Sequence, residues 1–151
     1  LGTTVTLYLP PSDKAAAAVA TSVENGIPQS GQETILVVED DRRVRRLTVT
    51  RLKDLGYKTL AVENGPAALD VLRKKEGIDL VLSDIVMPGG MNGFDVADQA
   101  LAINPALKIL LATGFASGGE AAAGAAKHRY TVLRKPYSLG DLAQALRSLL
   151  D

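Results

Sequence analysis

Hydrophobic and polar residues follow two alternating patterns from Thr34 to the end of the chain. Short runs of consecutive aliphatic residues predict five β-strands, at Thr34–Glu39, Tyr57–Val62, Asp79–Ser83, Leu107–Thr113 and Thr131–Lys135. Helical spacing between the runs predicts five helices, at Arg42–Asp54, Pro66–Lys75, Phe94–Ile103, the Ala/Gly-rich Ala116–Lys127 and the C-terminal segment. The strands read as aliphatic throughout, which is typical of a sheet buried on both faces.

Local signals support several of these helices. Asn64 is placed to cap the second helix, and Ser138 and Asp141 have capping-box spacing at the last one. Asp41 is expected to start the first helix. The basic run Arg42–Arg46 is expected to form a solvated helix face beside an apolar stripe made of Val44, Leu47, Leu52 and Leu55.

Strands that alternate with helices predict an α/β fold with right-handed crossovers and a parallel sheet covered on both faces. In such sheets, ligands bind beyond the carboxyl ends of the strands. Polar residues follow those ends in this chain: Glu39 and Asp40, Asp84, Thr113 and Lys135. Three carboxylates, a hydroxyl and an ammonium are therefore expected to meet at one edge of the sheet.

Clustered carboxylates repel one another unless a cation compensates them. Hard oxygen ligands without cysteine or a nearby histidine indicate Mg²⁺, which favours carboxylates together with phosphate oxygens. The predicted chemistry is phosphoryl transfer. Asp84 is the expected nucleophile, Thr113 the hydroxyl donor to a phosphoryl oxygen, and Lys135 the neutralising cation. Pro136 restricts Lys135 to an extended conformation and so keeps it at the strand end.

Composition narrows the class of protein. The 151 residues are 46% hydrophobic and carry 17 basic and 17 acidic side chains, so net charge gives no argument for nucleic acid or an anionic membrane. No direct nucleic-acid binding and no membrane contact by this chain are expected. There is no cysteine, which excludes disulfides and thiolate metal sites. Glycines at 89, 90 and 93 are expected to serve tight backbone turns.

The order of these motifs resembles the receiver domains of two-component response regulators. The resemblance rests on "ILVVEDD", "VLSDIVMPGGMNG", "LLATG" and "VLRKPY". It implies a flavodoxin-like fold with strand order 2-1-3-4-5 and helices on both faces. It also implies that Asp84 is the phosphoacceptor and that Mg²⁺ is held by Glu39, Asp40, Asp84 and the backbone carbonyl of Val86. The implied phosphate donor is a phosphohistidine on a kinase dimerisation domain or a histidine phosphotransfer protein.

The sequence departs from the usual receiver pattern at three places. The acidic pair is Glu-Asp where Asp-Asp is commoner, and the loop "MPGGMNG" is one residue longer than usual. Val132 stands where many receivers carry an aromatic residue that rotates on activation. We also predict that phosphorylation pulls Thr113 towards Asp84 and displaces the glycine-containing segment Ala116–Lys127, because glycine makes that helix marginal.

Residues 1–33 have a different character. "GTTVTLYLP" alternates as one half-buried strand, and residues 11–33 have the composition of a linker. The first stretch resembles the closing strand of a histidine-kinase ATP-binding domain. We therefore expect residues 1–10 to end a preceding kinase domain, 11–33 to be a linker and 34–151 to be the receiver of a hybrid histidine kinase. Such a chain is expected in the cytoplasm, with a parent that can be membrane-anchored.

Two other classes of protein remain open at this point. One is a magnesium-dependent phosphohydrolase that forms an aspartyl-phosphate, and the other is a non-catalytic flavodoxin-like interaction domain. The haloacid dehalogenase type wants a D-x-D pattern after its first strand, and "EDD" followed by Arg42 does not supply it. Whether the chain counts as an enzyme stays undecided, because a receiver only assists its own phosphorylation and dephosphorylation and the catalytic parts of a kinase are absent here.

Overall fold

The computed structural model describes residues 31–114 and 130–151. Strands and helices alternate along the chain as the aliphatic runs predict. The strands are β1 (Thr34–Val38), β2 (Lys58–Val62), β3 (Leu80–Asp84), β4 (Lys108–Thr113) and β5 (Thr131–Arg134). The helices are α1 (Arg42–Asp54), α2 (Gly65–Lys74), α3 (Gly93–Ile103) and α5 (Leu139–Leu150). The predicted helix Ala116–Lys127 and the segments 1–10 and 11–30 lie outside the described residues.

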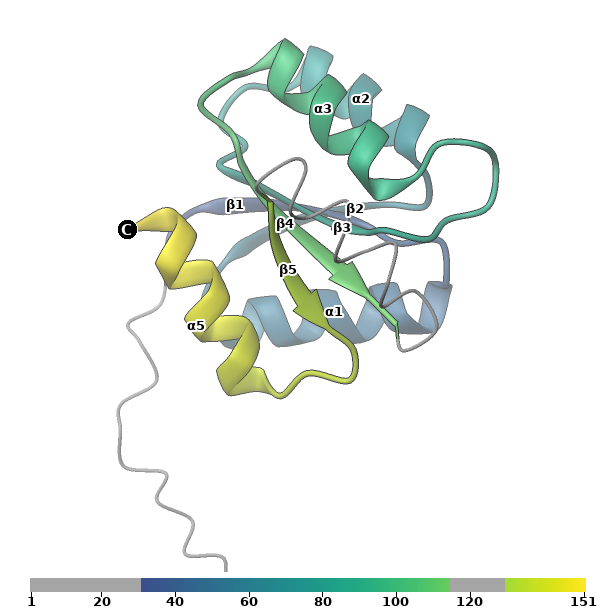
Figure 1. The fold of residues 1–151 in the computed structure, drawn as a ribbon. Helices are drawn as coiled ribbons and strands as arrows, with labels where there is room; N and C mark the ends of the chain where they lie inside the picture. The colour runs from purple at the N-terminus through teal and green to yellow at the C-terminus, as the bar shows by residue number, and fades with distance from the viewer. Residues whose placement is uncertain (1–30, 115–129) are drawn as a thin grey trace, which may run out of the picture.

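The five strands form one parallel sheet in the order β2-β1-β3-β4-β5. This order confirms the prediction of the strand arrangement. Helices α2 and α3 cover one face of the sheet, and α1 and α5 cover the other (Figure 1). The order in which successive strands are added to the sheet reverses at β1, so β1 and β3 are neighbours and their carboxyl ends lie side by side.

Alternate residues of the central strands belong to two separate hydrophobic cores. One core joins Leu36 and Val81 to α2 and α3, and the other joins Val37 and Leu82 to α1 and α5. Residues 35–38 of β1 are all buried to 1% exposure or less. This double burial explains the uninterrupted aliphatic runs and makes the central strands a rigid base for whatever follows them.

Side-chain caps fix where each described helix begins. Asp41 accepts hydrogen bonds from the backbone N–H groups of Arg43 and Val44, and Asn64 caps α2 through Ala67. Capping boxes open α3 (Asn92 with Asp95) and α5 (Ser138 with Asp141). The predicted caps at 41, 64 and 138 are confirmed.

The apolar stripe expected on α1 is only partly correct. Leu52 is fully buried and Leu55 is 4% exposed, but Leu47 is 53% exposed. The buried position one residue further on is taken by Thr48. Thr48 faces Tyr137, in the loop between β5 and α5, and Leu47 faces solvent.

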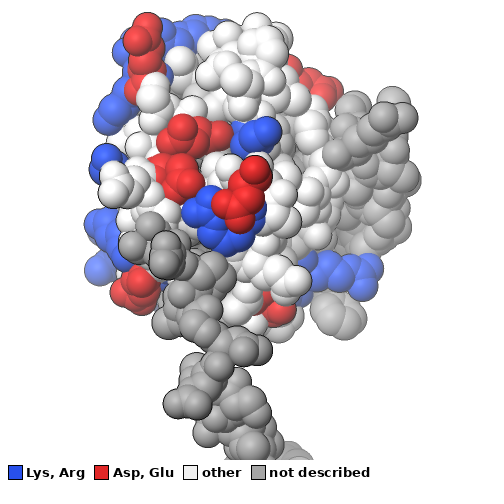
Figure 2. Space-filling model, turned by 90° about the vertical axis from the view of Figure 1, so that its left-hand side faces the viewer, with Lys and Arg blue, Asp and Glu red and all other residues white. Residues whose placement is uncertain are grey.

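Charged side chains of both signs are interspersed on the face that carries the amino ends of the strands. Figure 2 views the molecule from the left of Figure 1, where acidic and basic groups lie close together rather than in one patch of a single sign. Arg147 of α5 contributes there by bonding both Glu33 and Asp151. Among the described helices, none is long and apolar enough to cross a bilayer.

Candidate functional site at the carboxyl edge of the sheet

Three carboxylates meet beyond the ends of β1 and β3. Each of Glu39, Asp40 and Asp84 offers an oxygen that lies within 4.8 Å of the others. The register that pairs Val38 with Ser83 places the following residues of both strands beside each other. Glu39 is only 5% exposed, so its carboxylate is largely withdrawn from water. The predicted convergence of these acids is therefore present in the structure.

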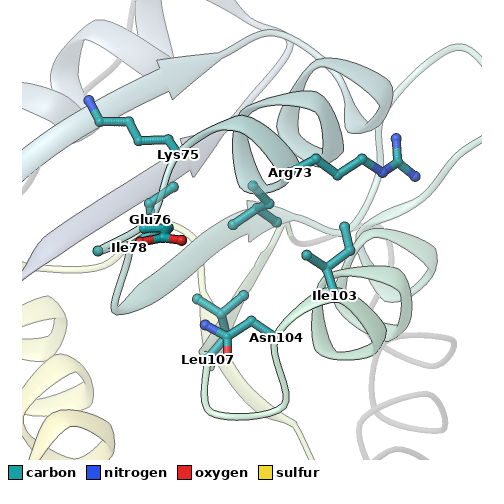
Figure 3. A pocket seen from close by; sticks show the side chains of 9 residues that line it. Arg73, Lys75, Glu76, Ile78, Ile103, Asn104 and Leu107 are labelled. Carbon is teal, nitrogen blue, oxygen red and sulfur yellow. The ribbon is translucent and has the colours of Figure 1, made fainter.

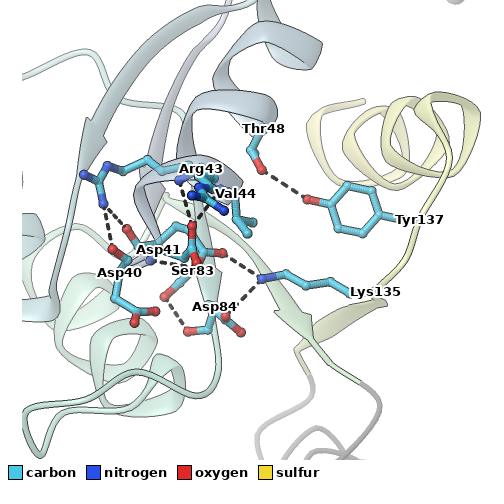
Figure 4. A network of polar contacts seen from close by, with 11 residues as sticks. Asp40, Asp41, Arg43, Val44, Thr48, Ser83, Asp84, Lys135 and Tyr137 are labelled. Atoms are coloured by element: carbon cyan, nitrogen blue, oxygen red, sulfur yellow. Dashed lines mark hydrogen bonds and ion pairs between the residues drawn. The ribbon is translucent and has the colours of Figure 1, made fainter. Parts of the chain in front are cut away.

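Lys135 supplies the positive charge at this cluster. Its Nζ donates to Oε2 of Glu39 at 2.7 Å and to Oδ2 of Asp84 at 3.0 Å (Figure 4). Its side chain is 22% exposed, so the bonds are partly shielded from solvent. Lys135 immediately follows β5, and its backbone N–H donates to the Thr113 carbonyl at 2.7 Å. A cis peptide bond links it to Pro136.

The two partners of this ion pair respond differently to burial. Burial raises the pKa of Glu39, and this effect outweighs the hydrogen bond from Lys135 that acts to lower it. Burial acts to lower the pKa of Lys135, but its hydrogen bonds to Glu39 and Asp84 prevail and the pKa is raised. The lysine is thus held in its charged form, while Lys135 offsets only part of the cost of burying the Glu39 carboxylate.

Thr113 ends β4 next to this cluster and is 2% exposed. Its hydroxyl donates to the carbonyl of Gly114 at 3.3 Å. Within residues 31–114 and 130–151, no hydrogen bond joins it to Asp84. Thr113 therefore lies at the predicted strand end, and its hydroxyl is hydrogen-bonded to the neighbouring Gly114 carbonyl.

The loop between β1 and α1 is fixed by Asp41 and by Arg45. The Arg45 guanidinium donates to the backbone carbonyl of Glu39 at 2.6 Å and to that of Asp40 at 3.1 Å. Arg42, Arg43 and Arg46 are exposed, as expected for a solvated basic face. Arg45 corrects that expectation, because it is half-buried and contacts the acidic pair. Because Arg45 stands in a run of similar arginines, no local signal in the sequence distinguishes it from its neighbours.

Glycine 93 allows α3 to begin against the end of β3. A Cβ at this position would collide with the carbonyl oxygen of Asp84 and would lie 2.8 Å from the Cα of Ile85. The expected role of Gly93 in a tight turn is therefore wrong, since what it permits is a close approach of two backbone segments. Gly89 and Gly90 do have positive φ angles, of 100° and 86°, as expected of turn residues.

Val86, the expected carbonyl ligand, lies in the same loop. Val86 is 58% exposed and lies two residues beyond Asp84. The loop is held by backbone bonds from Ile85 to Ala112 and from Gly93 to Ile85, each 2.9 Å long. These bonds fix the chain on both sides of Val86, and its assignment as a ligand stays a prediction.

A contact that the sequence did not indicate holds the loop after Lys135 against α1. The Tyr137 hydroxyl lies 3.4 Å from Oγ1 of Thr48 (Figure 4). Arg51 donates to the Tyr137 carbonyl at 3.0 Å and stacks over its ring at 5.7 Å. These three residues tie the segment that carries Lys135 to the helix that follows Glu39 and Asp40.

Tyr130, the aromatic residue next to β5, contacts α3 and, within the described part of the chain, not the acidic cluster. The Tyr130 hydroxyl donates to Oδ1 of Asp98 on α3 at 2.6 Å, and its ring stacks with Phe94. Burial and the Asp98 hydrogen bond raise the pKa of Tyr130 to about 12. Val132, where many receivers have an aromatic residue, packs against the core on the same side of the sheet.

The cluster has the donor set that Mg²⁺ prefers. Three carboxylates offer hard oxygen ligands, and the Lys135 ammonium already contacts Glu39 and Asp84 as a cation would. The residues present therefore fit a magnesium ion, with Glu39, Asp40 and Asp84 as the side chains that would hold it.

A separate hollow of about 380 Å³ lies at the opposite edge of the sheet, among the ends of α2 and α3 and the residues before β3 and β4. Figure 3 shows its lining, which includes Arg73, Lys75, Glu76, Ile103 and Asn104. A single acidic side chain lines it, whereas three acids meet beyond β1 and β3. The carboxyl edge is thus the better candidate for phosphoryl chemistry.

Comparisons with known proteins identify the family of the chain. Residues 35–147 match the family model described as the response regulator receiver domain. The chain is 39% identical over 116 residues to the response regulator receiver protein CpdR of Brucella abortus, which spans 77% of this chain and 95% of that protein. It is 32% identical over 158 residues to the sensor kinase CckA of the same organism, and this match covers 99% of the chain but 17% of that protein.

Solved structures show the same fold. A response regulator receiver protein from Sinorhizobium medicae superposes with a TM-score of 0.70 at 29% identity, over 79% of this chain and 94% of that one. A receiver domain protein from Clostridium thermocellum gives 0.72 at 24% identity, over 78% and 94%, and supports the fold alone. The family match, the strand order and the acidic cluster with its lysine agree, and the chain belongs to the response regulator receiver domains of two-component signalling.

Proposed function

We propose that this receiver accepts a phosphoryl group on Asp84 from a phosphohistidine in a His-Asp phosphorelay, with Mg²⁺ held by Glu39, Asp40 and Asp84. The observation that carries the proposal is the Lys135 ammonium bonded to both Glu39 and Asp84 at the ends of three strands. A lysine in that position lies where negative charge would increase when Asp84 is phosphorylated. The same acids, without the lysine, would support only cation binding.

Each side chain has a distinct part in the proposed transfer. An oxygen of the Asp84 carboxylate bonds to phosphorus while the bond from phosphorus to the donor's imidazole nitrogen breaks, and that nitrogen keeps the electron pair. Lys135 stays bonded to the carboxylate and neutralises the added charge. Thr113 exchanges its bond with Gly114 for one to a phosphoryl oxygen. When bound, magnesium supplies further positive charge beside the phosphoryl oxygens.

The proposal extends to the parent protein and its partners. The chain spans only 17% of the sensor kinase CckA, yet that match covers 99% of the chain, including residues outside the receiver family match. This supports an origin as the receiver of a hybrid histidine kinase. Residues 1–10 would then end its ATP-binding domain and residues 11–33 would be the linker. The phosphate donor is a phosphohistidine on the kinase dimerisation domain or on a phosphotransfer protein, and we place the domain in the cytoplasm with it.

Phosphorylation by a small donor tests this function. The purified chain is incubated with acetyl phosphate, with and without Mg²⁺, and the attached phosphate is measured by its release with hydroxylamine. Wild type and Asp54→Asn, a change at an exposed acid at the end of α1, are expected to be labelled only with magnesium. Asp84→Asn is expected to stay unlabelled. An unlabelled wild type, or labelling of Asp84→Asn at the wild-type rate, would contradict the proposal.

A further inference from the structure

The backbone carbonyls of Glu39 and Asp40 point to a single side chain rather than to a neighbouring strand. β1 ends at Val38, and the last ladder-type contact on this side is the Glu39 N–H to the Val62 carbonyl at 3.2 Å. Beyond that point Arg45 Nη1 donates hydrogen bonds to the carbonyls of Glu39 and Asp40, at 2.6 and 3.1 Å. Among the described residues, no backbone N–H is recorded on either oxygen.

We propose that Arg45 is a positioning residue for the metal site, acting through the peptide units of Glu39 and Asp40. Two consecutive carbonyls held by one nitrogen fix the orientation of both peptide planes. The directions of the two attached side chains follow from those planes, since each Cβ is set by its own backbone. Arg45 thereby keeps adjacent carboxylates, which would repel each other, aimed at one point.

The other hydrogen bonds of the loop do not orient both peptide units. Asp41, the next residue, is already occupied as the cap of α1, with its side chain on the N–H groups of Arg43 and Val44. Its own N–H reaches Oε1 of Glu39 at 3.3 Å, which restrains one acid only. Asp40 is restrained through its main-chain carbonyl, which accepts a hydrogen bond from Arg45.

The sign of the expected effect separates positioning from charge. A guanidinium near a cation site repels the cation, so Coulomb's law alone predicts that removing Arg45 strengthens magnesium binding. Loss of positioning predicts the opposite, because partners that orient metal ligands typically contribute about 10- to 100-fold in affinity. A weaker affinity in the variant therefore cannot come from the lost charge.

Arg46 provides a matched control. It is the next residue on α1, carries the same charge and is exposed. Within residues 31–114 and 130–151 its guanidinium makes no hydrogen bond or ion pair, while its backbone carbonyl accepts from Oγ1 of Thr50 at 3.0 Å. Arg46→Ala removes one positive charge from the same helical turn without touching the loop. Arg45→Lys keeps the charge and a hydrogen-bond donor on a shorter side chain. Its affinity for Mg²⁺ is therefore expected to lie between those of wild type and Arg45→Ala.

The experiment is a calorimetric titration of Mg²⁺ into the unphosphorylated chain, for wild type, Arg45→Ala, Arg45→Lys and Arg46→Ala. Thermal unfolding of each metal-free variant confirms that it is folded at the titration temperature. Relative to Arg46→Ala, we expect Arg45→Ala to bind Mg²⁺ about tenfold or more weakly and Arg45→Lys about threefold more weakly. If the alanine variant fails to fold, the lysine variant alone decides.

The inference rests on the proposed magnesium site, and the titration distinguishes the two. A wild type that binds no Mg²⁺ would overturn the proposed function and this inference together. A wild type that binds Mg²⁺, with the Arg45 variants binding it as tightly as Arg46→Ala or more tightly, would overturn only the positioning role. Arg45→Ala weaker than both Arg46→Ala and Arg45→Lys is the result that supports it.

Discussion

Replacing Lys135 with alanine is expected to destabilise the metal-free protein and to make it unusually responsive to magnesium. The substitution removes the bonds from Nζ to Glu39 at 2.7 Å and to Asp84 at 3.0 Å. It leaves three carboxylates, including the buried Glu39, without their cation. The site then lacks positive charge until an ion binds.

The magnitude follows from the geometry of the two bonds. Hydrogen bonds to charged groups contribute about 1.5 to 3 kcal/mol each, and the cost of burying the ammonium offsets part of that sum. A net loss of about 3 kcal/mol is expected, which lowers Tm by about 12 °C for a domain of this size. Magnesium at about one hundred times its Kd adds about 2.7 kcal/mol, so saturation restores most of the loss.

Thermal unfolding with and without Mg²⁺ measures both effects, with exposed Lys74 changed to alanine as the control. Magnesium should raise Tm more in Lys135→Ala than in wild type, because the ammonium no longer occupies oxygens of Glu39 and Asp84. A variant that melts at the wild-type temperature without metal would show that Lys135 does not stabilise the metal-free site. A magnesium-induced rise in Tm no larger than that of wild type would show that the ammonium does not compete with the ion for these oxygens.

Three further changes test other parts of the structure. Gly93→Ala should destabilise the fold by about 1 to 3 kcal/mol in urea unfolding and slow phosphorylation, because the new Cβ collides with the Asp84 carbonyl, whereas Gly140→Ala has room and should do neither. Hydrogen bonds from Ser138 lower the pKa of Asp141 below its ordinary 3.8, so their contribution to stability is present above that pH and is lost as the pH falls through the folded pKa. Asp141→Asn should therefore be less stable than wild type at pH 7 and equal to it in acid. Arg147→Ala should cost about 1 to 2 kcal/mol in urea unfolding, because it breaks the partly buried pair with Glu33.

The strands and most helix starts were predictable because their signals are local. An aliphatic run such as residues 35–38 indicates burial on both faces without knowledge of any partner, and Asn64 or Ser138 caps a helix through atoms a few residues away. The acids, Thr113 and Lys135 were predictable for a related reason. Parallel strands bring their carboxyl ends to one edge, so position in the sequence decides position in space.

Features that depend on packing between elements were not predictable. Leu47 fits an apolar stripe by spacing, but in the folded protein Thr48 is buried against Tyr137 and Leu47 is exposed. Arg45 lies in a run of similar arginines, and only the folded loop separates it from Arg46. The collision that reserves position 93 for glycine involves Asp84 and Ile85, nine and eight positions earlier in the chain, and no local pattern indicates it.

Chemical trapping of the phosphorylated residue tests whether Asp84 is the phosphoacceptor. The chain is incubated with Mg²⁺ and acetyl phosphate, treated with borohydride, which reduces an acyl phosphate to an alcohol, and digested for mass spectrometry. We predict reduction at Asp84 alone, and only when magnesium is present. Reduction at Glu39, Asp40 or another acid with Asp84 unchanged, or no reduction at any residue, would contradict this prediction.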